Sequence, residues 1–587
     1  MKDFWKMFFA SLLGSIFSYV IITILFFVIL VGIIVKLASF STKTTGINIK
    51  DNSILVLNLN KEIVERSSDL FSSFSSLSSL NDNQIELYTL LKTIRYAAQD
   101  DRIKGMLVHV SSPNAGYGTL QSIRQAIASF KKKGKFVVAY GEGMTQKAYF
   151  IASVAHKILL AKGSNLELKG IYFQLMFFKK ALEKLNIDVQ VIRHGKFKSA
   201  VEPFILEKMS PENREQYELL ATSLWKTLAD SITKSRTIFY DTLNFVVNNL
   251  LAYQSANAYR YKLVDSLLYY SDLTSYVNDH FKTEMNFIQF QDYLASEKEK
   301  MIKSSSNKIA LVFAYGDIIV DGSKYEPGSI QGEYYAELIK KLANKDDIKA
   351  IVLRVNSPGG DALASEQIWH SVVEATQKKP VVVSMGDYAA SGGYFISCAA
   401  NYIVAEPTTI TGSIGVFGLI PNAQRLMNQK LGITIDEVKT HEHSDFISIF
   451  KSLSSYDTKI LQQEIEKIYT SFTTAVAKGR KLDIAKVDSI GQGRVWLGLD
   501  ALKIHLVDTF GNLQTAIQKA AQLAKIDNYS VVEYPKKTSS IEKLVEKLTT
   551  ESSYFALNRT FVNYIKHYIS VNKPVWLTRM PFEIIMN

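Results

Sequence analysis

A serine followed by two glycines, Ser391-Gly392-Gly393, comes shortly after the apolar, β-branched run 381–384. A serine at a turn from strand to helix exposes its hydroxyl above the sheet, which is the arrangement of a nucleophile elbow. A second glycine-rich turn, Gly359-Gly360, follows the apolar run 351–355. Its backbone N–H groups could hold an oxyanion that develops on a substrate carbonyl. Either turn alone is also compatible with an ordinary tight turn, so the interpretation depends on a base for the serine.

The usual base for a serine nucleophile is histidine, but no histidine is well placed in this chain. His370 precedes the serine in a helical stretch, and His441 and His443 lie in a polar stretch typical of a solvated loop, although that loop could in principle supply a base. Lys198 is the other candidate. A lysine acts as a base only when it is neutral, which requires burial in an apolar site. The alternative is a plain surface lysine beside Lys196.

A long internal repeat organises the chain, with an offset of about 245 residues. The segment 101–108 matches 346–353, and Tyr149-Phe150-Ile151 matches Tyr394-Phe395-Ile396. A repeat of this length is a duplicated domain and not a solenoid unit.

The two copies differ at the residues that could do chemistry. The first copy lacks the serine and both glycine pairs, and the second copy lacks the lysine. In the first copy, Gln146-Lys147-Ala148 stand in place of Ser391-Gly392-Gly393, and Asn114-Ala115 stand in place of Gly359-Gly360. In the second copy, Lys198 corresponds approximately to Ser444. Complementary loss after a duplication is what one composite site would leave. We therefore expect the lysine of the first copy to meet the serine of the second.

Short apolar, β-branched runs alternate with helical patterns in each copy, which predicts an α/β fold with a mainly parallel sheet in each repeat. Ligands of such sheets bind at the carboxyl ends of the strands, where both glycine-rich turns fall. The expected organisation is an amino-terminal membrane anchor (1–45), a first repeat that supplies the lysine (46–305), a second repeat that supplies the serine (306–535) and a carboxyl-terminal tail (536–587).

The anchor is predicted from a long apolar run. About residues 8–35 carry no charge until Lys36 follows, and as a helix this length spans a bilayer of about 30 Å with some tilt. It is longer than the apolar region of a cleaved secretory signal, which is about 7–15 residues. The lysines on its two sides nearly balance, so charge alone does not orient it.

Composition excludes several classes of protein. The net charge of +12 is spread over 587 residues without a basic, aromatic-rich block, so no nucleic-acid partner is expected. The single cysteine, Cys398, excludes an intrachain disulfide and a cysteine-based zinc site. We expect that cysteine to be a small buried residue.

Several motifs resemble the signal peptide peptidase A (protease IV) family of the long, duplicated type, over about residues 46–535. They occur in the order of that family and read GKFKSAVEPF, NSPGG, DYAASGGYFIS, TGSIGVFG and GRVWLGLDA. The resemblance implies two tandem domains of the Clp-protease/crotonase superfamily after one transmembrane helix. It also implies a serine protease with a Ser/Lys dyad, in which Ser391 is the nucleophile, Lys198 the general base and Ser413 the hydroxyl that orients the lysine.

The same resemblance implies the setting of the enzyme. Gly359 and Gly360 would form the oxyanion hole, and no cofactor or metal would be required. The substrates would be remnant signal peptides, cleaved by a homotetramer anchored in the lipid of the cell inner membrane with its catalytic domains on the periplasmic or outer side. Two alternatives stay open at this point, a crotonase-type acyl-CoA enzyme and a non-catalytic membrane scaffold.

Overall fold

The structure is a computed structural model, and it describes most of the two predicted repeats. The described residues are 48–67, 84–302, 304–320, 322, 325–536 and 577–579, with 4–8, 10–15, 17–19, 21–22 and 25 near the amino terminus. Those amino-terminal residues are helical and expose large apolar side chains. Among the described residues, no helix has both the length and the apolar character needed to cross a membrane. Much of the predicted span 8–35, and most of the predicted tail 536–587, lie outside the described residues.

The first repeat is built on a parallel sheet of six strands. In spatial order the strands are β8 (Ser266–Leu267), β6 (Lys157–Leu160), β5 (Phe136–Gly141), β4 (Ile103–His109), β1 (Ser53–Asn58) and β9 (Asn286–Gln289). The short strands β2 (Glu62–Val64) and β3 (Gln84–Glu86) form a separate parallel pair. Nearly all residues of the central strands are buried, as expected for a parallel sheet covered on both faces.

The second repeat has a larger sheet in the same order. Its strands are β20 (Thr509–Phe510), β16 (Tyr402–Ala405), β15 (Val381–Ala390), β13 (Ile348–Ser357), β10 (Lys308–Tyr315) and β21 (Ser530–Tyr534). Two further strands, β17 (Ile410–Gly412) and β19 (Val495–Leu497), extend the sheet from the far end of β15, and β19 runs antiparallel to β17. The predicted α/β class with a mainly parallel sheet in each repeat is confirmed.

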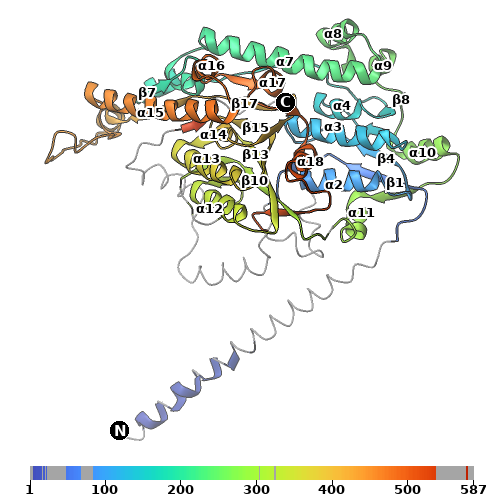
Figure 1. Cartoon of the computed structure of the whole chain (residues 1–587), viewed down its shortest axis with the longest axis horizontal. Coiled ribbons are helices and arrows are strands. Elements are labelled where there is room, and N and C mark those ends of the chain that lie inside the picture. Colours follow the sequence, from blue (N-terminus) through green and yellow to red (C-terminus); the bar gives the residue numbers. More distant parts are fainter. Residues whose placement is uncertain are drawn as a thin grey trace.

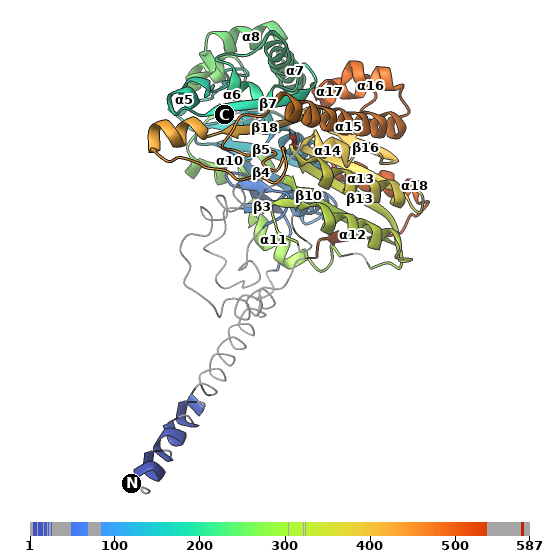
Figure 2. The ribbon, with the colours of Figure 1, turned by 90° about the vertical axis from the view of Figure 1, so that its left-hand side faces the viewer.

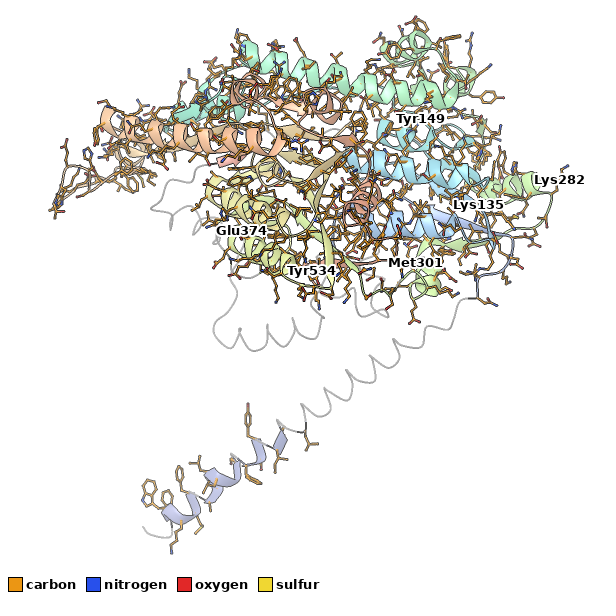
Figure 3. All side chains as sticks on the ribbon, in the orientation of Figure 1. Lys135, Tyr149, Lys282, Met301, Glu374 and Tyr534 are labelled. Atoms are coloured by element: carbon orange, nitrogen blue, oxygen red, sulfur yellow. The ribbon has the colours of Figure 1, made fainter. Side chains whose placement is uncertain are left out.

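The duplication is also visible in side-chain contacts. The Tyr149 hydroxyl donates to the Leu263 carbonyl at 2.8 Å, and the Tyr394 hydroxyl donates to the Leu506 carbonyl at 2.9 Å. The internal repeat matches Tyr149 with Tyr394, so each unit ties the helix after its third long strand to a turn through the matched tyrosine. Figure 3 labels Tyr149 on the first unit, and Glu374 and Tyr534 on the second.

Helices cover both sheets, and Figure 1 shows the two units side by side. The first unit carries α2 (Leu87–Ala97), α3 (Tyr117–Lys132), α4 (Gln146–Ala152), α5 (Lys179–Lys184), α6 (Glu202–Ile205), α7 (Pro211–Arg236), α8 (Tyr240–Asn248), α9 (Ser255–Arg260), α10 (Leu273–Phe281) and α11 (Phe290–Glu297). The second carries α12 (Gly332–Ala343), α13 (Ala362–Thr376), α14 (Gly392–Phe395), α15 (Ser455–Arg480), α16 (Ile484–Ile490), α17 (Gly498–Lys503) and α18 (Leu513–Leu523).

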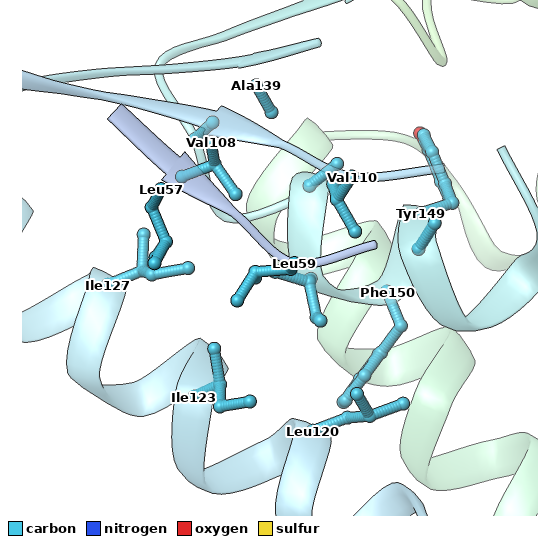
Figure 4. Packing of buried hydrophobic residues seen from close by; sticks show 14 of the residues in the cluster. Leu57, Leu59, Val108, Val110, Leu120, Ile123, Ile127, Ala139, Tyr149 and Phe150 are labelled. Atoms are coloured by element: carbon cyan, nitrogen blue, oxygen red, sulfur yellow. The ribbon is translucent and has the colours of Figure 1, made fainter. Parts of the chain in front are cut away.

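The apolar faces of these helices form the cores. In the first unit, Leu120, Ile123 and Ile127 recur at helical spacing on α3 and pack against Leu57 and Val108 of the sheet (Figure 4). The second unit has its own large core beneath α12, α13 and α15. Each repeat thus buries an apolar core of its own, which is expected for a duplicated domain.

A third sheet joins the two units. Its order is β12 (Ser329–Gln331), β11 (Asp317–Ile319), β14 (Gly359–Asp361), β22 (Leu577–Arg579), β18 (Val416–Asn422) and β7 (Asp188–His194). Strand β7 comes from the first repeat but pairs antiparallel with β18 of the second, from Val416 opposite His194 to Asn422 opposite Asp188. Figure 2 shows β7 and β18 side by side. The first repeat therefore extends one strand across the boundary between the units.

Buried polar contacts fix the two units against each other. Arg354 on β13 is fully buried and donates to the carboxylate of Glu65 from the first unit at 2.8 and 3.1 Å. Asp387 on β15 accepts hydrogen bonds from the N–H and the hydroxyl of Thr119 in the first turn of α3. An acceptor in that position caps a helix amino terminus. Strand β15, which leads to Ser391, is thus held by the other unit.

Candidate active site

Ser391 lies where β15 ends and α14 begins. Its backbone has φ 56° and ψ −118°, a combination that is strained for any residue other than glycine. Its N–H donates to the Gly412 carbonyl at 2.8 Å, which ties the turn to β17. The nucleophile-elbow geometry expected from the sequence is therefore present, with the serine on a sharp turn between strand and helix.

Lys198 reaches this serine from the other unit. It follows β7 and is fully buried. Its Nζ lies 2.8 Å from Ser391 Oγ, 3.1 Å from Ser413 Oγ and 3.2 Å from the Ser413 carbonyl oxygen. The sequence predicted that Lys198, Ser391 and Ser413 belong to one site, and the hydroxyls of both serines indeed contact Lys198 Nζ.

Burial changes the acid–base character of this lysine. Removal from water lowers the pKa of the Lys198 ammonium well below its ordinary value, because the protonated form loses its hydration. The ring of Phe417, with its centroid 6.0 Å from Nζ, forms part of the apolar surroundings. A neutral amine with a free lone pair can accept a proton from a hydroxyl, so this environment suits a general base.

Ser413 stands where it can orient that amine. It follows β17 with a positive φ of 53°, and its N–H donates to the Arg494 carbonyl at 2.7 Å. Its hydroxyl and carbonyl oxygens, both within 3.2 Å of Lys198 Nζ, accept the amine hydrogens that do not face Ser391. The remaining lone pair of the neutral amine is then directed at the Ser391 hydroxyl.

Gly359 and Gly360 lie on β14, next to the turn that carries Ser391. Both have a positive φ, and a Cβ on Gly360 would come within 2.0 Å of the Ile318 carbonyl oxygen, so only glycine fits there. A Cβ on Gly393 would lie 2.7 Å from the Ser357 carbonyl oxygen, which shows how closely the two turns pack. The Gly359 N–H donates to Ser357 Oγ at 3.1 Å. The oxyanion-hole role of these glycines remains a prediction.

The histidines considered from the sequence are engaged elsewhere. His443 pairs with Asp457 at 3.2 Å and stacks on Tyr456, while His370 is exposed and faces Glu374. Cys398 is buried, its thiol donates to the Phe395 carbonyl, and burial raises its pKa to about 12. The expectation that Cys398 is a small buried residue is confirmed.

Two glycines that position the lysine were not singled out from the sequence. A Cβ on Gly195 would lie 2.5 Å from the Gln492 carbonyl carbon, and a Cβ on Gly493 would lie 2.7 Å from the Lys198 backbone nitrogen. The Phe197 N–H also donates to the Gln492 carbonyl at 2.9 Å. The loop before the lysine therefore packs backbone to backbone against the other unit. Gly493 could have been identified from the sequence, because it is the first residue of the motif GRVWLGLDA.

No group of three or more His, Cys, Asp or Glu side chains in the described part of the chain is placed to hold a metal ion. The family model for "Clp protease" matches residues 325–410 in the second unit, and the first unit repeats the strand order of that α/β unit. A buried serine in an elbow beside a lysine is a site for serine peptidase chemistry. The model for "Peptidase family S49" matches residues 129–284 and 374–527, one stretch in each unit and together more than half of the chain.

Curated relatives agree over most of the sequence. "Protease 4" of Salmonella typhi is 36% identical over 477 residues, which cover 79% of this chain and 76% of that protein. "Protease 4" of Haemophilus influenzae is 34% identical over 516 residues, covering 85% and 83%. "Serine protease SPPA, chloroplastic" of Arabidopsis thaliana is 29% identical over 527 residues, covering 87% and 75%.

The chain belongs to peptidase family S49 and is a serine peptidase. The resemblance to the signal peptide peptidase A (protease IV) family is thereby confirmed. Membership of a peptidase family favours this activity over the acyl-CoA enzyme and the scaffold.

Proposed function

We propose that this chain is a membrane-bound endopeptidase in which Ser391 and Lys198 form a catalytic dyad. The observation that carries the proposal is the 2.8 Å contact between Lys198 Nζ and Ser391 Oγ, made inside a fully buried site. Burial favours the neutral lysine, and the strained elbow presents the serine hydroxyl to it.

The chemistry follows from that geometry. The neutral amine of Lys198 takes the proton of Ser391 Oγ while Oγ bonds to the substrate carbonyl carbon. The carbonyl oxygen becomes an oxyanion, which we assign to the backbone N–H groups of the Gly359–Gly360 turn. Lys198 then gives its proton to the leaving amine as the peptide bond breaks, which leaves an acyl-enzyme. Water, deprotonated by Lys198, attacks the acyl carbon, and Oγ recovers the proton.

The third sheet supports binding of the substrate as an extended strand. Residues 577–579 of the chain itself run antiparallel to β14, with Gly360 opposite Thr578, and Leu577 also pairs with Phe417 of β18. Strand β14 carries the candidate oxyanion turn, and strand β18 contributes Phe417, whose ring lies beside Lys198. A peptide added between them would have its backbone fixed by main-chain hydrogen bonds, the mode of recognition called β-augmentation.

This placement predicts competition between the tail and substrate. Deleting residues 575–587 frees the gap between β14 and β18, so we expect the apparent KM for a short peptide to fall by about threefold or more while kcat changes little. Steady-state kinetics of the full chain and the deletion variant measure both constants. An unchanged or higher KM in a variant with the same thermal unfolding would contradict strand binding at this position.

We propose remnant signal peptides as the substrates and the cell inner membrane as the location, with the catalytic units on the periplasmic or outer side. The exposed apolar side chains of the helical residues near the amino terminus support an anchor in lipid, since water disfavours such a surface. The resemblance also supports assembly as a homotetramer.

Cleavage in lipid vesicles tests this function. The full-length enzyme is reconstituted and given an internally quenched peptide with a signal-peptide-like apolar core, and a matched peptide in which serines replace the core leucines. We expect kcat/KM to be at least about tenfold higher for the apolar peptide. Equal cleavage of the two peptides would contradict the proposed substrate class but leave the peptidase assignment in place.

A further inference from the structure

The first unit has a large cavity at the place that corresponds to the active site of the second unit. Its volume is about 590 Å³, within the range of about 300–1,000 Å³ that ligand sites occupy. The turn 112–116 and Lys147 of α4 are among the residues that line it. The internal repeat matches Ala115 with Gly360, and Lys147 with Gly392. The cavity therefore lies between the counterparts of the two glycine-rich turns.

This cavity lacks the group that would attack a peptide bond but keeps a donor that can hold an anion. Gln146 stands in place of Ser391 and supplies no nucleophile. Its side-chain oxygen accepts from the N–H groups of Lys169 and Gly170 at 3.2 and 2.9 Å, so the amide is fixed by its own unit. The N–H of Ala115, the counterpart of a residue in the candidate oxyanion turn, has no acceptor among the described residues. It can therefore donate to an anionic ligand in the cavity.

One charge that lines the cavity has no counter-ion. The carboxylates of Glu62, Glu167 and Asp387 each accept a hydrogen bond from a neighbouring side chain. The ammonium of Lys169 is the partner of Glu167, at 3.2 Å. Of the charged side chains that line the cavity, only that of Lys147 makes no hydrogen bond or ion pair with the described residues. It is half-buried, and loss of hydration lowers its pKa. An anionic ligand would stabilise this partly buried cation.

The turn 112–116 also offers an open strand edge. On one side, Asn114 forms a parallel bridge with Glu62 of β2. The counterpart of this turn in the second unit, β14, pairs with β11 on one side and with residues 577–579 on the other. Within the described residues, no strand occupies the second side of 112–116. An extended peptide can therefore pair with this edge as residues 577–579 pair with β14.

We propose that this cavity binds the carboxyl-terminal end of a short peptide, with the peptide carboxylate on the Lys147 ammonium and the Ala115 N–H and the peptide backbone along the turn 112–116. Hydrolysis of a peptide bond leaves a new carboxylate on the amino-terminal fragment. The ligand class therefore includes the products of the peptidase itself. The proposal needs only the peptidase class of the chain, and it does not depend on the roles proposed for Ser391 and Lys198.

Photochemical cross-linking tests the position of the site and the chemistry of its ligand. The full-length chain carries Ser391→Ala to prevent cleavage, and it is used whole because Asp387 and Tyr388 of the second unit also line the cavity. The probe is a short apolar peptide with benzoylphenylalanine next to its carboxyl end, made as the free acid and as the amide. We expect mass spectrometry to find the acid attached within 112–116 or 145–149, and the amide attached there at least about tenfold less. Peptide mapping separates this product from attachment near β14.

Three variants assign the carboxylate to its partner. Lys147→Gln removes the charge, so we expect the preference for the acid over the amide to fall by at least about tenfold. Lys147→Arg keeps a cation and should retain the preference. Lys162→Gln is the matched control, because Lys162 lies over the Tyr269 ring as Lys147 lies over the Tyr117 ring, but outside the cavity. It should also retain the preference, and thermal unfolding shows that each variant is folded.

Equal attachment of the acid and the amide within 112–116 and 145–149, or attachment near β14 alone, would overturn the proposal. A preference for the acid that survives Lys147→Gln would also overturn it, because the carboxylate would then have another partner. The last arm compares acetate with an unlabelled peptide acid as competitors. We expect only the peptide acid to displace the probe at matched concentration. Equal displacement by acetate would mean that the cavity holds a small anion and not a peptide end.

Discussion

Replacing Ser391 by alanine, or Lys198 by alanine, is expected to lower kcat/KM by about 10⁴-fold or more, while the protein remains folded and assembled. The first change removes the atom that bonds to the substrate, and the second removes the group that takes its proton. Because the two residues act in one step, we expect the double variant to be no less active than the worse single variant. Hydrolysis of the quenched apolar peptide measures all three.

The neighbouring lysine supplies the control for this prediction. Lys196 is exposed and lies two residues before Lys198, so Lys196→Ala should retain wild-type kcat/KM. Mixed assemblies of Ser391→Ala and Lys198→Ala chains should remain inactive, because the dyad forms within one chain. Activity restored by mixing would mean that the lysine comes from another copy. Near wild-type activity in Lys198→Ala would mean that the base is a different group.

The second large effect is a dependence of activity on pH. Lys198 is the base only when neutral, so below its folded-state pKa we expect kcat/KM to fall tenfold for each pH unit. Burial lowers that pKa, so the rise in activity with pH should be complete well below the ordinary lysine value of about 10.4. Initial rates in overlapping buffers, with circular dichroism to establish the folded range, measure the profile.

Titration of a buried carboxyl group could produce a similar rise of kcat/KM with pH, called here the rising limb of the profile. One variant distinguishes such a carboxyl group from Lys198 as the cause of this limb. Burial raises the pKa of Glu406 to about 7, where it accepts hydrogen bonds from Ser122 and Gln125 of the other unit. Glu406→Gln removes this titration but leaves Lys198 in place, so the limb should persist unchanged. Loss of the rising limb in Glu406→Gln would mean that the limb reports titration of Glu406 at the contact between the units, and not titration of Lys198. A limb that levels only near the ordinary lysine pKa would contradict a desolvated base.

Much of this molecule could be predicted from local patterns. The β-branched runs around 351–355 and 381–384 became β13 and β15, because a continuous apolar run suits a strand buried on both faces. The internal repeat identified two units, and the complementary loss of lysine and serine predicted a composite site. The contact of Lys198 with Ser391 confirms that these two residues meet.

The rest depends on contacts that a local pattern does not encode. The alternation in residues 188–194 indicates a strand, but it does not say that its partner is β18, more than two hundred residues later in the chain. The positive φ of Ser391 and Ser413 arises from turns held by hydrogen bonds to distant backbone groups. Gly195 and Gly493 are required because the two loops that carry them pack closely in space. The sequence shows a glycine at each position, but it does not show which distant loop lies against it.

Labelling of the active serine tests the central claim most directly. The purified full-length enzyme is treated with a serine-directed fluorophosphonate, and the intact mass and the modified peptide are determined. We expect one adduct per chain, located on Ser391, and almost none in Lys198→Met, which keeps a side chain of similar length but has no base. An adduct on another residue, or equally fast labelling in Lys198→Met, would contradict a serine that is activated by this lysine.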